Sequence, residues 1–182
     1  IGCTLLLQLA RELAGTPVAG TVTMAICVQE EIGLRGAQVA AYRTRPDYAI
    51  AIDTFMSGDT PDVDYYTELS ARIGAGPVLL LANSAHMGHP AVNQYVRDAA
   101  RAAGVQLQES MVGQGMAATD AGAIHLSRAG VPTAGLSLAR RYSHTPMCTL
   151  DLNDAAGALR ILLALVRGME GHTDLSFFAG AR

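Results

Sequence analysis

Apolar residues recur along the chain in two spacings, and together they predict an alternation of helices and strands. Leucines at helical intervals cover residues 5–13, and the pattern stops at Gly15. Later apolar runs have the length and side chains of strands, most clearly the β-branched run 21–28, which we expect to be a buried central strand. Further strands are predicted at 48–54, 76–84, 105–111 and 131–139.

Helical spacing of small and apolar residues fills the intervals between these runs. We expect helices at 35–43, at about 90–103, at 121–130, and from about 151–154 onward. Gly104 stands in a favoured terminating position, and Thr119 or Asp120 is the expected cap of the helix at 121–130. Strands that alternate with helices predict a layered α/β domain, with a largely parallel sheet and helices on both faces.

The composition is typical of one compact domain. Of the 182 residues, 50% are hydrophobic and 16% are charged, which is enough apolar material for a sizeable core. The formal net charge is -3 and the basic residues are scattered, so no nucleic-acid partner is expected. The aliphatic run 161–166 is too short to cross a bilayer and no leader precedes the first residues, so no membrane partner is expected either.

Two further features bear on the setting of the chain. Cys3, Cys27 and Cys148 each lie in or beside an apolar stretch, so we expect buried, reduced thiols and a cytoplasmic location. The chain begins at Ile1 and enters a helical pattern at once. That beginning is expected of a piece of something longer, although a processed amino terminus would look the same.

The candidate chemistry starts with two adjacent carboxylates, Glu30 and Glu31, which follow the run 21–28 where glycines permit a turn. Asp53 ends the next predicted strand, and His144 follows the last one. In open α/β sheets, ligands bind outside the carboxyl ends of the strands, so these side chains are expected to converge. A solvated loop that happens to carry two acids is the alternative for the glutamate pair.

Carboxylate oxygens together with one imidazole suit Zn, Mn or Co. A bound divalent metal makes hydroxide available at neutral pH, and a carboxylate that stays off the metal can carry the proton. The pattern therefore predicts metal-assisted hydrolysis.

Other polar residues have plainer explanations. His86 and His89 lie in one loop, but no nearby cysteine or acid completes a metal shell. His125 falls within a predicted helix and is expected to be a packed or partly exposed imidazole. The aspartates of the polar segment 55–75 lack the spacing of a calcium loop, so we expect that segment to be a long, solvated surface loop.

Four ordered motifs resemble the M42 family of metallo-aminopeptidases. They are QEEIGLRGA, AIDT, TDAGAIHLSRAGVPT and RYSHTP, and the resemblance spans nearly the whole chain. It implies that Glu30 is the general base, that Glu31 and His144 bind one metal, and that Asp53 binds the other.

The resemblance also implies a zinc-peptidase-like fold, two divalent metal ions (Zn, Co or Mn), peptide substrates, and a homo-oligomer in the intact protein. Thr119 and Asp120 match a Thr-Asp pair that lies beside the family's substrate cleft. In the family a further His, an Asp that bridges both metals and a smaller inserted domain precede the part that resembles residues 1–13. Residues 1–182 are therefore expected to be a single catalytic-domain fragment, incomplete at its amino terminus and short of two metal ligands.

The expected function is hydrolysis of amino-terminal residues from peptides by water activated between two metals. Two alternatives remain. One is a non-catalytic assembly or peptide-binding subunit of the same fold, and the other is a related di-metal amide hydrolase.

Overall fold

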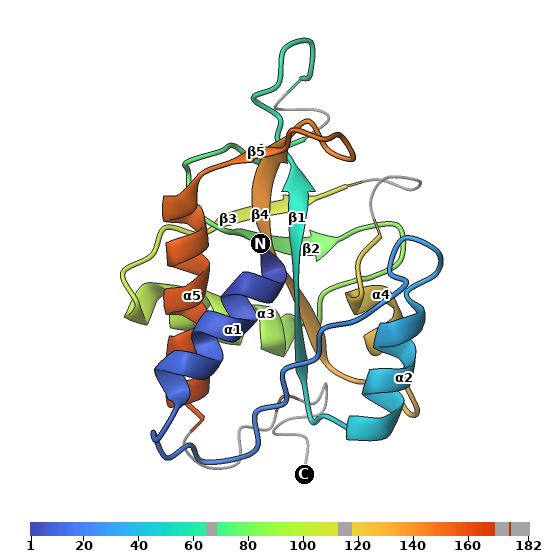
Figure 1. Cartoon of the computed structure of the whole chain (residues 1–182), viewed down its shortest axis with the longest axis vertical. Helices are drawn as coiled ribbons and strands as arrows, with labels where there is room; N and C mark the ends of the chain where they lie inside the picture. The colour runs from blue at the N-terminus through green and yellow to red at the C-terminus, as the bar shows by residue number, and fades with distance from the viewer. Residues whose placement is uncertain (65–68, 113–117, 170–174, 176–182) are drawn as a thin grey trace.

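A β-sheet runs through the middle of the molecule and carries helices on both faces (Figure 1). The computed structural model describes residues 1–64, 69–112, 118–169 and 175. The strand order is β1-β4-β2-β3, and β5 pairs with β4. The strands are β1 (Ala49–Met56), β2 (Val78–Ala82), β3 (Gln108–Met111), β4 (Thr133–Arg141) and β5 (Thr149–Leu150).

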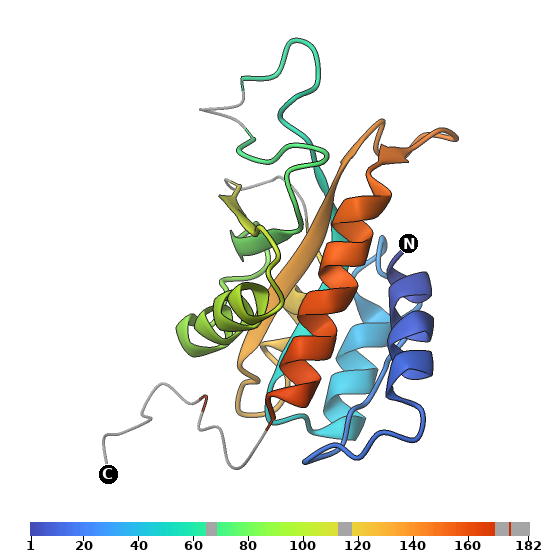
Figure 2. The same cartoon turned by 90° about the vertical axis from the view of Figure 1, so that its left-hand side faces the viewer.

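The helices divide between the two faces of the sheet. Three of them pack together over one face: α1 (Gly2–Leu13), α3 (Pro90–Ala102) and α5 (Leu152–Arg167). Figure 2 shows α5 along β4, with α1 beside α5. Two shorter helices contact each other on the other face, α2 (Arg35–Thr44) and α4 (Ala121–Ile124).

The predicted α/β class is confirmed, and the sheet is mixed. β1 runs parallel to β4, and β2 runs parallel to β3, whereas β4 is antiparallel to both β2 and β5. The sheet is thus less uniformly parallel than an alternation of elements predicts. The alternation fixes which segments are strands, but contacts between distant segments set the direction in which each strand runs.

The main core lies between the sheet and the three-helix face. Leu136 and Leu138 of β4 are each 1% exposed and pack with Val92, Val96 and Ile161 of the helices. Residues 133–139 are buried throughout, which is why the sequence of β4 is almost continuously apolar. The centre of the domain is therefore β4.

The ends of most elements follow local rules. Gly104 adopts a positive φ of 61° directly after α3, as expected of a terminating glycine. The side chain of Asp151 caps α5 by accepting a hydrogen bond from the N–H of Asn153 at 2.7 Å. The predicted boundaries of α1, α2, α3 and α5 and of β1 to β4 are confirmed to within a few residues.

The prediction of a buried strand at 21–28 is wrong. This segment is extended, but among the described residues it belongs to no strand, and Ile26 and Val28 are 56% and 67% exposed. A strand requires hydrogen bonds to a neighbouring strand, and β-branched side chains alone do not supply them. Half-buried positions such as Val22 and Met24 alternate with exposed ones, so one side of the segment rests on the domain.

The helix predicted at 121–130 is also wrong in length, since α4 has only 4 residues. Neither Thr119 nor Asp120 makes the predicted capping hydrogen bond, because the Asp120 backbone is already helical. Past α4 the chain turns, and Arg128 has a φ of 57°. The Arg128 guanidinium lies 3.7 Å from the centre of the Tyr42 ring and donates from Nε to the Tyr42 carbonyl at 2.9 Å. Backbone hydrogen bonds of turns take the place of helical ones: the Ser127 N–H donates to the Ile124 carbonyl at 2.9 Å, and the Val131 N–H donates to the His125 carbonyl at 3.1 Å.

The expected burial of the cysteines is wrong, although all of them are free thiols. Cys3 and Cys148 are exposed, and Cys27 is partly buried. Cys3 lies on the side of α1 opposite the buried Leu5 and Leu9, so an apolar sequence context did not place it in the core.

The polar segment 55–75 is only partly a surface loop. Beyond β1 its described residues form no helix or strand, as predicted. However, Ser57, Leu69 and Ala71 are almost fully buried. A Cβ on Gly58 would collide with the backbone carbonyl of Leu69, so the two arms of the segment approach as closely as only glycine allows.

None of the helices in the described part of the chain combines the length and the hydropathy that a transmembrane span needs.

Candidate active site

Glu31 and His144 meet in space. Glu31 Oε1 lies 3.1 Å from His144 Nε2, although one residue precedes α2 and the other follows β4. Both side chains are open to solvent, with exposed fractions of 71% and 68%. The predicted convergence is thus present for these two residues.

The turn around the glutamates is tight. The Glu30 carbonyl accepts hydrogen bonds from the N–H groups of Gly33 and Leu34 at 3.1 and 2.9 Å. Gln29 and Leu34 adopt positive φ angles of 59° and 55°, a left-handed conformation that is costly for residues with a Cβ. This turn ends the extended segment and aims the glutamates toward the end of the sheet.

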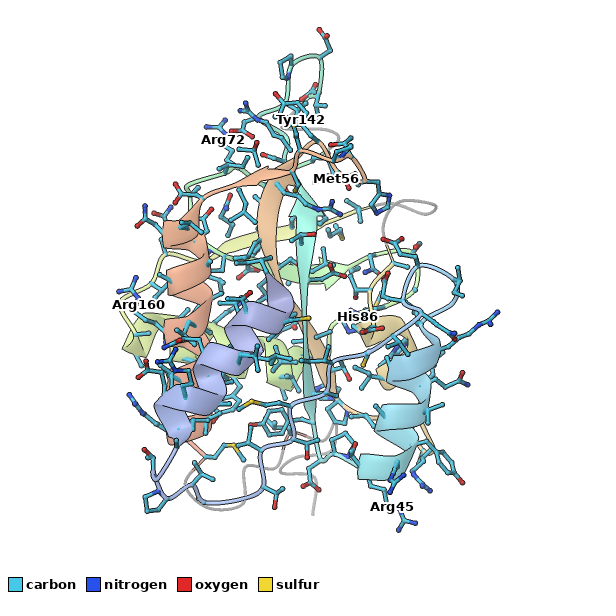
Figure 3. All side chains as sticks on the ribbon, viewed as in Figure 1. Arg45, Met56, Arg72, His86, Tyr142 and Arg160 are labelled. Carbon is cyan, nitrogen blue, oxygen red and sulfur yellow. The ribbon has the colours of Figure 1, made fainter. Side chains whose placement is uncertain are left out.

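The loop after β4 is bent in the same way. Tyr142 and His144 have φ angles of 58° and 56°. The Thr145 hydroxyl donates to the Tyr142 carbonyl at 2.7 Å, which closes the turn around His144. Figure 3 shows Tyr142 at the same end of the sheet as Met56, the last residue of β1. The turns that carry Glu31 and His144 therefore both contain non-glycine residues in left-handed conformations.

Glu30 lies in the most acidic part of the site. Its pKa is raised to about 7, first by partial burial and then by the negative charges of Asp53, Glu31 and Asp120, while His144 acts in the opposite direction. A carboxyl group that titrates near neutral pH can both accept and donate a proton under ordinary conditions.

Asp53 lies inside β1 and not at its end, because the strand continues to Met56. It is opposite Ser137 in the parallel ladder with β4. Burial raises the pKa of Asp53, and this outweighs the hydrogen bond from the Thr54 N–H at 2.7 Å and the charge of Arg140, which both lower it. Asp53 is close enough to Glu30 for its charge to raise the pKa of Glu30.

Thr119 and Asp120 enter from the start of α4. Thr119 is 3% exposed, and within the described part of the chain its hydroxyl has no hydrogen-bond partner. Burial raises the pKa of Asp120, and a hydrogen bond from the thiol of Cys27 partly offsets this. In turn, burial and the charge of Asp120 raise the pKa of Cys27 to about 11.

Cys27 is a site residue that the sequence analysis missed. Its position just before the Glu30–Glu31 turn is the signal that could have revealed it. A neutral thiol there acts as a hydrogen-bond donor to a carboxylate, and not as a nucleophile.

The residues present fit part of a divalent-metal site. Carboxylates crowd together at the end of the sheet with one imidazole, and a cation would relieve their mutual repulsion. Glu31 and His144 are close enough to bind the same ion. Within residues 1–64, 69–112, 118–169 and 175, no group of three or more His, Cys, Asp or Glu side chains has the spacing of a metal shell.

His86 and His125 contact each other. His86 is 3% exposed, and its ring contacts that of His125 edge to face at 5.4 Å between centroids. His86 Nε2 is 3.2 Å from the Thr133 carbonyl, and His125 Nδ1 is 2.9 Å from the Ala121 carbonyl. Figure 3 shows His86 beside α4. His125 is partly buried, so the prediction of a packed or partly exposed imidazole is confirmed.

Asp59 is not solvated as predicted. It forms an ion pair with Arg141, with Nη2 2.9 Å from Oδ2, and both side chains are about two-thirds buried. An ion pair between residues so far apart in the sequence could not be foreseen from the sequence.

The fold matches a class of known structures, the aminopeptidases. The TET aminopeptidase from the marine sediment archaeon Thaumarchaeota archaeon SCGC AB-539-E09 superimposes with a TM-score of 0.84 at 31% identity, over 91% of this chain and 46% of that chain. The Pyrococcus horikoshii TET1 peptidase, which can assemble into a tetrahedron or a large octahedral shell, gives 0.74 at 30% identity, over 89% and 46%.

Sequence comparison agrees with the structural match. The M42 glutamyl aminopeptidase family matches residues 1–161, and the chain belongs to this family. A glutamyl aminopeptidase of Lactococcus lactis subsp. cremoris (strain MG1363) is 32% identical over 168 residues, which is 92% of this chain and 45% of the relative. The chain thus spans about half the length of the relatives it matches.

Proposed function

We propose that this chain is a carboxyl-terminal part of the catalytic domain of a metal-dependent aminopeptidase that removes amino-terminal residues from peptides. The observation that carries the proposal is the 3.1 Å contact between Glu31 and His144, beside Glu30, in a chain that belongs to the M42 family. These residues come from separate segments, and the fold brings them together at one end of the sheet.

In this proposal Glu31 and His144 are ligands of one divalent ion, and Asp53 is a ligand of a second. Zn, Co and Mn are the candidates, because the donors are carboxylate oxygens and an imidazole nitrogen. Such ions, when bound, lower the pKa of water and polarise a carbonyl group.

Glu30 is the proposed general base. Its carboxylate takes a proton from the attacking water and returns one to the departing amine, so the same group acts as base and then as acid. Its position one residue before Glu31 lets it face the same space without being a metal ligand, since the turn separates the two side chains.

Thr119 and Asp120 are the proposed contacts for the amino end of the peptide. A free amino terminus is a cation at neutral pH, and the Asp120 carboxylate offers it a charge-assisted hydrogen bond. Through this contact with Asp120, the enzyme would select peptides that have a free amino end.

The wider setting is also part of the proposal. The intact protein is a homo-oligomer, which the assemblies of the TET1 peptidase support. A cytoplasmic location suits the free thiols of Cys3, Cys27 and Cys148. Residues 1–182 form a single unit of the catalytic domain, without the smaller inserted domain of the family.

The test is elemental analysis of bound metal in the purified 182-residue chain, beside a version extended upstream to the start of its reading frame. Two ions per extended chain and fewer in the shorter one would support the proposal. No metal in either would favour a non-catalytic assembly or peptide-binding subunit. Hydrolysis of an aminoacyl reporter, but not of its N-acylated form, would separate an aminopeptidase from other di-metal amide hydrolases.

A further inference from the structure

A polar cluster joins the carboxyl ends of β1 and β4, and none of the roles above uses it. It consists of Ser57, Asp59 and Arg141, and we call it the strand-end clamp. Arg141 Nη2 donates to the Asp59 carbonyl at 2.7 Å and lies 2.9 Å from Asp59 Oδ2. The Ser57 hydroxyl donates to Asp59 Oδ1. The Arg141 guanidinium thus binds both the side chain and the backbone carbonyl of Asp59.

The clamp closes the ladder between the two strands. Met56 is the last residue of β1 and pairs with Arg140, and the Ser57 N–H then donates to the Arg140 carbonyl at 2.9 Å. Past this point the backbones of the two strands separate. Beyond the last main-chain hydrogen bond, the ion pair between the side chains of Asp59 and Arg141 links the two strands. These side chains are 29% and 31% exposed.

A candidate metal ligand lies in β1, and another follows β4. Asp53 lies in β1, and His144 lies in the turn between β4 and β5, whose base is the pairing of Arg141 with Thr149. Residues 144–149 are all exposed, so little packing holds this turn in place. Within it, the described hydrogen bonds are local ones made by Thr145. Arg141, at its base, is where the turn is fastened to the end of β1.

We propose that Arg141 and Asp59 are positioning residues for His144. By fixing the β4–β5 turn to the end of β1, they hold the His144 imidazole against Glu31 and at a set distance from Asp53. The inference rests on the proposed function, because the place of His144 matters to the extent that it is a metal ligand. A lysine at 141 would keep the charge, but it could not bind the Asp59 side chain and carbonyl through a planar fork.

The chain offers a matched control. Arg97 and Glu109 form a second bidentate pair, with contacts of 2.7 and 2.9 Å and exposed fractions of 31% and 38%. This pair links α3 to β3, away from the ends of β1 and β4. Loss of either arginine removes a comparable ion pair, but only the pair of Arg141 with Asp59 fastens the turn that contains His144.

The experiment compares Arg141→Gln, Arg141→Lys, Asp59→Asn and Arg97→Gln in the product of the complete reading frame. Zinc affinity is measured by competition with a chromogenic chelator, and amide hydrogen exchange is followed by mass spectrometry. We expect the Arg141 and Asp59 variants to bind zinc about tenfold or more weakly, as for other residues that orient a ligand. Exchange should rise in residues 142–148. Arg97→Gln should change neither the zinc affinity nor the hydrogen exchange of residues 142–148.

Equal zinc affinity in wild type and Arg141→Gln would overturn the inference and leave the proposed function intact. A wild-type protein that binds no zinc, cobalt or manganese would overturn the proposed function instead. In that case hydrogen exchange decides the positioning role: faster exchange at 142–148 in Arg141→Gln but not in Arg97→Gln supports it, and unchanged exchange refutes it. Should Arg141→Gln fail to fold, Arg141→Lys and Asp59→Asn provide the same readings.

Discussion

Glu31 Oε1 and His144 Nε2 lie 3.1 Å apart, and both belong to turns in which neighbouring non-glycine residues have left-handed backbones. Such conformations cost on the order of 1–3 kcal/mol each and persist where the surrounding structure enforces them. Their presence on both sides of one contact identifies this end of the sheet as the place where the fold has given up local stability for a particular geometry.

The first prediction concerns His144. Replacement by alanine should lower the bound metal in the product of the complete reading frame, because one of the two paired ligands is lost. Elemental analysis after dialysis measures the effect. Unchanged metal content would remove His144 from the set of ligands.

The second prediction concerns Glu30. Glu30→Gln keeps the size of the side chain but cannot accept a proton, so turnover should fall by about 10²-fold or more while bound metal is retained. The measurements are kcat on an aminoacyl reporter and metal content on the same sample. A matched control is Glu12→Gln on the exposed side of α1, which should leave both unchanged. If Glu30→Gln turned over normally, Glu30 would not be the base.

The third prediction concerns Asp154, a buried residue of α5. Its carboxylate accepts hydrogen bonds from the N–H groups of Gly74 and Gly76, both at 2.8 Å, and thereby ties the segment before β2 to α5. An asparagine offers one acceptor oxygen in place of two, so Asp154→Asn should lower the free energy of unfolding by about 1.5–3 kcal/mol. Urea denaturation measures this.

The control for Asp154 lies three residues earlier. Asp151 caps α5 through the Asn153 N–H, and asparagine caps a helix about as well as aspartate. Asp151→Asn should therefore change the unfolding free energy by only a few tenths of a kcal/mol. Equal losses in the two variants would show that the buried carboxylate has no special role.

The fourth prediction is a pH dependence. Burial lowers the pKa of His86 in the folded protein, so the unfolded chain binds more protons as the pH falls through about 6.5, the ordinary value for histidine. Stability from this residue is complete above that pH and declines below it. His86→Gln keeps a donor toward the Thr133 carbonyl but cannot take up a proton.

The measurement is the unfolding free energy of wild type and His86→Gln at pH 7.5 and 5.5. We expect wild type to lose more stability on acidification than the variant does. Glu30 contributes with the opposite sign, since a raised carboxyl pKa favours the folded state as the pH falls, but it is common to both proteins and cancels in the difference. Equal losses would mean that His86 titrates alike in the folded and unfolded states.

The sequence predicted the elements better than it predicted their partners. Apolar periodicity and terminating residues located α1, α3 and α5 and the strands β1 to β4, because these signals are local. The prediction from sequence failed at residues 21–28, where apolar side chains suggested a strand but no described strand pairs with the segment. The sequence-based prediction also failed at α4, where the backbone forms turns after residue 124 and the Arg128 side chain contacts Tyr42 of α2.

The features of the candidate site also divide into those that the sequence predicts and those that depend on the tertiary structure. The sequence by itself determined which residues are candidates for the chemistry, since Glu30, Glu31, Asp53 and His144 each follow or occupy a predicted strand or extended run. Only the tertiary structure decided that Glu31 meets His144, that carboxylates crowd around Glu30 and raise its pKa, and that Arg141 clamps Asp59. The physical reason is range: turns and periodicity depend on neighbours along the chain, whereas charge, burial and ion pairing depend on neighbours in space.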